Sequence, residues 1–134
     1  MTTSTLGRRA ALITTLLASA VLVAAPMGVA AKDSDIIRTG SCSASTDWKL
    51  KLSPENGRVE VEFEIDQNRN GQTWDVKLKK NGSSFWCGQR TTQAPSGSFE
   101  TRRVVSGANG DRFAGIATNP RTGETCRGTA TFSA

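Results

Sequence analysis

The chain has 134 residues, a formal net charge of +5 at neutral pH, three cysteines, and neither histidine nor tyrosine. The lack of histidine removes the commonest general base and the commonest transition-metal ligand, and no serine-hydrolase, penicillin-binding or zinc-protease motif is present, so we expect no enzyme, no metal and no cofactor. Charges of both signs are interspersed rather than clustered, so no nucleic-acid partner is expected.

The first 31 residues have the organisation of a secretory signal peptide. Arg8 and Arg9 precede a long apolar run, and small residues follow it. Cleavage is expected before Lys32, with cleavage after Ala30 as the alternative. The paired arginines leave the twin-arginine export route open beside the general secretory route. A secreted, extracellular protein is therefore predicted.

The remaining chain has the length of one small domain. Residues 32–41 are predicted to form a flexible N-terminal tail, and residues 42–134 to form the folded domain. No later segment approaches the ~20 apolar residues that a membrane helix needs, so no membrane span is expected in the mature chain. We expect this domain to be a monomer.

From Asp47 onward the hydrophobic period is two, which is typical of strands with one buried face. The predicted strands cover 47–52, 58–65, 74–79, a strand after the turn at Asn81–Gly82, 98–105, 111–118 and 124–132. Seven short strands with turn signals about every eight to twelve residues predict an all-β fold, an antiparallel immunoglobulin-like or fibronectin type III-like β-sandwich. A small closed β-barrel is the alternative.

The pair Asn81–Gly82 is favoured in two-residue type I′ turns, and such a turn fixes the register of the hairpin around it. The predicted pairs are Leu78 with Phe85 and Val76 with Cys87 on the buried face, and Lys77 with Trp86 on the outer face.

Trp48 and Trp74 occupy inward positions and are predicted to be core residues. Trp86 is predicted to face outward, where it could stack on a sugar or a partner; the alternative is that a lysine stem covers it. The alternation breaks near Arg102 and Arg103, which predicts a bulge or a misplaced strand boundary there.

Three cysteines in a secreted chain allow one disulfide and leave one thiol over. Cys42 precedes the first predicted strand and Cys126 lies in the last, and first and last strands are often neighbours in such sandwiches. We therefore predict a Cys42–Cys126 disulfide and a buried free thiol at Cys87. A reactive Cys87 is the less favoured alternative, because the chain has no histidine to activate it.

Asp66, Asn68 and Asn70 have the spacing with which an EF-hand calcium loop begins. Lys77 stands at the position of the essential bidentate glutamate, and Arg69 lies inside the loop. The polar residues are therefore interpreted as turn formers, with weak calcium binding left open.

In the predicted sandwich the loops 66–73, 91–97 and 119–123 lie at the same end, where such folds often bind ligands. The candidate binding residues are Asp66, Asn68, Arg69, Asn70, Arg90, Gln93, Asn119 and Arg121, with Trp86 as a further exposed candidate.

The stretches "DWKLKL", "VEVEFEID" followed by "NGQTW", "SGSF" and "GETC", together with Cys42, are similar to those of a group of small secreted actinobacterial proteins of unknown function. The similarity covers about 90 residues. It implies secretion and an all-β domain. In this group the first and last cysteines recur, which suits a Cys42–Cys126 pair, whereas Cys87 departs from the pattern of the group. It implies no activity.

These observations favour a secreted, non-catalytic binding or cell-surface structural module. Its expected partner is a protein or a cell-wall or carbohydrate ligand. The alternative is a secreted inhibitor or small-ligand carrier that uses the loops at one end.

Overall fold

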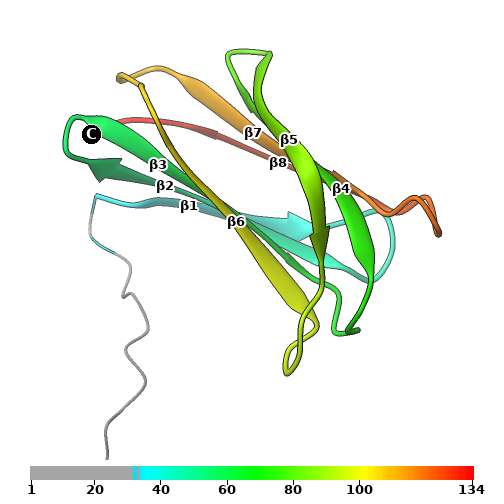
Figure 1. Ribbon diagram of the computed structural model, residues 1–134. Helices are drawn as coiled ribbons and strands as arrows, with labels where there is room; N and C mark the ends of the chain where they lie inside the picture. Colours follow the sequence, from blue (N-terminus) through cyan, green and yellow to red (C-terminus); the bar gives the residue numbers. More distant parts are fainter. Residues whose placement is uncertain (1–31, 33) are drawn as a thin grey trace, which may run out of the picture.

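The computed structural model describes residue 32 and residues 34–134, so the signal-peptide prediction for 1–31 lies outside the described residues. The strands are β1 (Ile36–Ser41), β2 (Asp47–Glu55), β3 (Arg58–Asp66), β4 (Thr73–Lys80), β5 (Ser83–Thr91), β6 (Ser98–Val105), β7 (Arg112–Thr118) and β8 (Thr125–Thr131). They form two antiparallel four-stranded sheets, as Figure 1 shows. The predicted sandwich is confirmed, and the closed barrel is wrong because each sheet keeps two edges.

The first sheet, sheet A, has the strand order β1-β2-β3-β6, and the second, sheet B, has the order β5-β4-β7-β8. The seven predicted strands all occur, and the chain crosses from sheet A to sheet B after β3. The eighth, β1, was not predicted. It lies inside the supposed tail, which is therefore wrong for 36–41: this segment pairs with β2, and Ile36 packs against the core. No helix of the described part is long and apolar enough to cross a membrane.

The core lies between the sheets and is formed by the alternate residues that the period-two pattern predicted. Trp74 is fully buried, and its Nε1 donates a hydrogen bond to Gln67 Oε1 at 3.0 Å. Trp48 also faces inward but is only half-buried, because β2 lies close to an open side of the sandwich. The core assignment of both tryptophans is thus confirmed.

The β4–β5 hairpin turns at Asn81 and Gly82, whose φ angles of 48° and 84° suit a type I′ turn. The register then shifts between Leu78 and Lys79. Beyond the shift the observed pairs are Leu78 with Trp86, Lys77 with Cys87 and Val76 with Gly88. Two predictions are therefore wrong. Trp86 was predicted to face outward but faces inward, and Cys87 was predicted to be buried but is exposed on the outer face of sheet B.

The physical reason is that two consecutive large aromatic residues pack inward. Phe85 and Trp86 both pack against the core, and the Phe85 ring meets Phe113 edge to face with 6.2 Å between centroids. A regular strand would send neighbouring side chains to opposite faces, so an extra unpaired residue is needed to bring both inside. Phe85 is that residue.

The bulge or misplaced boundary expected near Arg102 and Arg103 is wrong as well. β6 pairs with β3 in an unbroken register from Val59 opposite Val105 to Asp66 opposite Ser98. Arg102 simply faces outward, and Arg103 faces inward on an edge strand.

Candidate functional site

Four connections lie together at one end of the sandwich, which we call the loop end. They are 42–46, 67–72, 92–97 and 119–124. Three of them match the loops that the sequence placed at a common end. The fourth, 42–46, was not predicted to join them.

Loops 67–72 and 92–97 are held together by Thr92, which is buried. Its backbone N–H donates to Gln72 O at 2.9 Å, and its carbonyl accepts from Gly71 N at 2.8 Å. Its hydroxyl donates to Arg69 O at 2.5 Å and accepts from Gln72 N at 2.9 Å. Gln67 N adds a 3.1 Å bond to the carbonyl of residue 97. Hydrogen bonds therefore join the two loops into one unit.

Loops 42–46 and 119–124 are held together by the carboxylate of Glu124, which is only 7% exposed. It accepts hydrogen bonds from Ala44 N at 3.0 Å, Thr46 N at 3.1 Å and Thr46 Oγ1 at 2.6 Å. The Cys42–Cys126 disulfide, with an S–S distance of 1.99 Å, lies beside this contact and confirms the predicted pairing. A buried carboxylate is stable here because three donors replace its hydration.

An open polar cavity of about 450 Å³ lies between these two pairs of loops. It is lined by Ser43, Ala44, Ser45, Gln67, Arg69, Thr122, Gly123 and Glu124. Hydroxyl, amide, guanidinium and carboxylate groups therefore converge from three connections that are distant in sequence. This lining offers both donors and acceptors of hydrogen bonds, and it suits a hydrophilic ligand.

Of the predicted binding residues, only Arg69 lines this cavity. Five further candidates at this end are exposed but do not line the cavity: Asp66, Asn68, Asn70, Gln93 and Arg121. Asp66 lines a separate open pocket of about 430 Å³ on the outer face of sheet A. The sequence thus placed these loops at a common end of the fold, but it named few of the side chains that line this cavity.

Asn119 is fully buried and presents no surface to a ligand. Its Oδ1 accepts from Arg121 N at 3.0 Å, and its N–H donates to Glu124 O at 2.9 Å. It shapes the β7–β8 turn, which explains a polar residue at this point of the sequence.

The loop that resembles a calcium site is used as a turn. Asp66 Oδ1 accepts a hydrogen bond from Asn68 N at 3.2 Å, and Asn68 and Gly71 have φ angles of 56° and 74°. Within the described residues, no group of three or more His, Cys, Asp or Glu side chains is placed to hold a metal ion.

A second site lies on the side of the sandwich where the edge strands β5 and β6 approach each other. The Cζ atoms of Arg90 and Arg103 lie 4.7 and 4.6 Å from the ring centroid of Trp86. We call these three residues the Trp86 cluster. Trp86 and Arg90 were candidates from the sequence, whereas Arg103 was noticed only as a break in the alternation.

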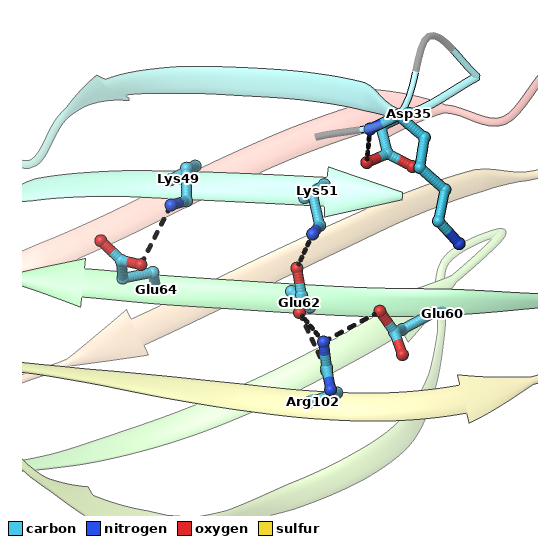
Figure 2. A network of polar contacts seen from close by, with 8 residues as sticks. Asp35, Lys49, Lys51, Glu60, Glu62, Glu64 and Arg102 are labelled. Carbon is cyan, nitrogen blue, oxygen red and sulfur yellow. Dashed lines mark hydrogen bonds and ion pairs between the residues drawn. The ribbon is translucent and has the colours of Figure 1, made fainter. Parts of the chain in front are cut away.

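The outer face of sheet A carries a network of ion pairs, shown in Figure 2. Glu62 accepts from Lys51 at 2.5 Å and from Arg102 at 2.5 and 2.8 Å, and Arg102 also reaches Glu60 at 3.3 Å. Burial alone would raise the pKa of Glu62, but hydrogen bonds from Lys51 and Arg102 outweigh it and hold the pKa below its usual value. Glu62 is fully partnered, so this network is structural.

Comparison with known proteins identifies no family. No protein-family model matches the chain, and no curated protein matches it either. Among solved structures, the chain matches the crystal structure of a bromine derivative of BhCBM56, with 19% identity and a TM-score of 0.41. The similarity covers 71% of this chain and 100% of that one. The identity and the TM-score are too low for this similarity to indicate a function.

Proposed function

We propose that the protein is an extracellular, non-catalytic binding module that takes a hydrophilic ligand in the cavity at the loop end. The observation that carries this proposal is the convergence of three connections on one polar cavity, each held in place by hydrogen bonds from the buried residues Thr92 and Glu124. A site that is already rigid loses little conformational entropy when a ligand binds.

The chemistry of the lining supports binding rather than catalysis. Serine and threonine hydroxyls lie in the cavity, but the chain has no histidine to activate them, and the carboxylate of Glu124 already accepts three hydrogen bonds from Ala44 and Thr46. Cell-wall or other carbohydrate hydroxyl groups, or a polar segment of a protein, match such a lining. An extracellular location is supported by the leader-like start of the chain and by the disulfide.

The test is affinity capture with the mature domain immobilised, comparing cell-wall fragments with soluble proteins from culture fluid. Arg69→Ala should weaken the captured interaction about tenfold, the loss expected for one charged contact of about 1.4 kcal/mol. The matched control is Arg112→Ala, which removes the same charge from the opposite end of the sandwich and should leave capture unchanged.

Equal binding by wild type and Arg69→Ala would contradict the assignment of the ligand to this cavity. Capture of a single tight soluble protein or small molecule, rather than wall material, would favour an inhibitor or carrier over a cell-surface module.

A further inference from the structure

The guanidinium groups of the Trp86 cluster have no acidic partner. Arg90 Nη1 donates to the carbonyl of Gln89 at 3.0 Å, and Arg103 Nη1 donates to the carbonyl of Arg102 at 2.6 Å. In the part of the chain that the structure describes, neither arginine takes part in a salt bridge. Each therefore keeps most of its five N–H donors free.

The acidic residues of the domain are concentrated elsewhere. The outward positions of sheet A hold seven carboxylates, Asp47, Glu55, Glu60, Glu62, Glu64, Asp66 and Glu100, and four cations, Lys49, Lys51, Arg58 and Arg102. The outward positions of sheet B hold one carboxylate, Asp75, and four cations, Lys77, Lys79, Arg112 and Arg127. The Trp86 cluster lies between these two faces, because Arg90 belongs to β5 of sheet B and Arg103 to β6 of sheet A. The cluster itself contains two cations and no carboxylate, so it favours anions locally.

The geometry of the cluster also orders the two arginines. A guanidinium stacked against an aromatic ring is held in a defined plane, while the N–H groups at its rim can still bind a carboxylate in a bidentate way. The ring packs closely against its own strand at residue 88, where a Cβ would lie 2.6 Å from Trp86 Cζ2. The cluster therefore presents two cations oriented by one ring.

We propose that the Trp86 cluster binds carboxylate groups of an acidic polysaccharide. This site is separate from the loop-end cavity and does not depend on the proposed function of that cavity. An acidic peptide fits less well, because a peptide at an open edge would add as a further strand. The bulge in β5 and the inward-facing arginines on both edge strands oppose such pairing. A polysaccharide needs only the cations.

The test measures binding of polygalacturonate by calorimetry at moderate ionic strength, with neutral dextran as the reference polymer. Wild type should bind polygalacturonate and not dextran, and Arg90→Ala/Arg103→Ala should bind at least tenfold more weakly. The matched control is Lys77→Ala/Arg127→Ala, which removes two positive charges from the outer face of sheet B and should change the affinity less than about threefold.

A conservative pair, Arg90→Lys/Arg103→Lys, separates recognition from folding. It retains both charges but loses the planar bidentate donors, so binding should fall severalfold while the unfolding midpoint stays near that of wild type.

Three outcomes would overturn the inference. If the wild-type domain does not bind polygalacturonate, Arg90 and Arg103 would only cover the edge strands β5 and β6. Equal losses in the cluster variant and the charge-matched control would indicate unspecific attraction. Binding of poly-glutamate with the same affinity and the same dependence on Arg90 and Arg103 would assign the site to an acidic peptide instead.

Discussion

The sandwich has two open sides, and the chain closes them in different ways. On one side the edge strands are β1 and β8; on the other they are β5 and β6. Each side is covered by an inward-facing, half-buried tryptophan that packs against glycine. The two differ in what holds the tryptophan and its strands in place.

On the β1–β8 side, the ring of Trp48 lies between Gly40 and Gly128, so that it bridges the two sheets. The Cys42–Cys126 disulfide adds a covalent link between β8 and the residue that follows β1. On the β5–β6 side, Trp86 is flanked by two arginines and no covalent bond joins the sheets. One side is closed for stability, whereas the other leaves charged donors available to a ligand.

The largest difference between the sides should appear when the disulfide is removed. Cys42→Ala/Cys126→Ala releases a cross-link between residues 84 positions apart, and the free energy of unfolding should fall by about 4 kcal/mol. Urea denaturation measures it. Cys87→Ala is the control on the other sheet edge and should change stability by less than about 0.5 kcal/mol, because its side chain is exposed.

A loss below about 1 kcal/mol in the disulfide variant would show that the β1–β8 side is held by packing alone. The distinction between a covalently closed side and a non-covalent side would then disappear.

A matched pair of glycine substitutions compares the two tryptophans directly. A Cβ at residue 128 would lie 2.5 Å from Trp48 Cζ3, and one at residue 88 would lie 2.6 Å from Trp86 Cζ2. Gly128→Ala should cost about 2–3 kcal/mol because the Trp48 ring is confined between two strands. Gly88→Ala should cost about 1 kcal/mol, since Trp86 lies on a bulged edge strand that can adjust.

Thermal unfolding together with tryptophan fluorescence measures both costs and both ring environments. Equal losses, or a larger loss from Gly88→Ala, would contradict the view that the Trp86 side is the more adaptable one.

Acid should loosen the β5–β6 side first. Arg102 joins the edge strand β6 to Glu62 on β3. The pKa of Glu62 in the folded state lies below its ordinary value of 4.5, so its stabilisation is complete above pH 4.5 and is lost as the pH falls through the lower, folded-state pKa. The expected loss is about 1–2 kcal/mol.

The prediction is checked by measuring amide hydrogen-exchange protection factors for β6 and β8 at a pH above 4.5 and at a pH below the folded-state pKa of Glu62. Protection of β6 should fall before that of β8, and Glu62→Gln should remove the difference between the two pH values. Loss of protection in both strands together would indicate global unfolding instead.

The strands were predictable where one face is buried and the other is exposed to solvent. β3 alternates valine, phenylalanine and isoleucine with charged residues, and its extent follows from that pattern. β1 was missed because, as an exposed edge strand, it buries little and shows no alternation. The Asn81–Gly82 turn forms where it was predicted. The sequence could not report the bulge at Phe85, because the bulge depends on packing against Phe113 from another strand.

The site was less predictable than the fold. Glu124 meets Thr46, which lies 78 positions earlier, and Thr92 meets Arg69, which lies 23 positions earlier. Both polar residues lie at the ends of strands or in loops, where hydrophobic periodicity carries no information. Arg103 did leave a signal, the break in alternation along β6, but that signal indicates an unusual side-chain direction as readily as a bulge.

The bulge in β5 has a practical consequence. By turning Cys87 outward, it leaves a thiol on the outer face of sheet B, while the other two cysteines are joined to each other. Mild alkylating reagents should therefore attach a dye or spin label at one defined position of the native domain, without mutagenesis. A label at that point sits close to the Trp86 cluster and far from the disulfide, so it can report on one side of the sandwich while the other serves as its reference.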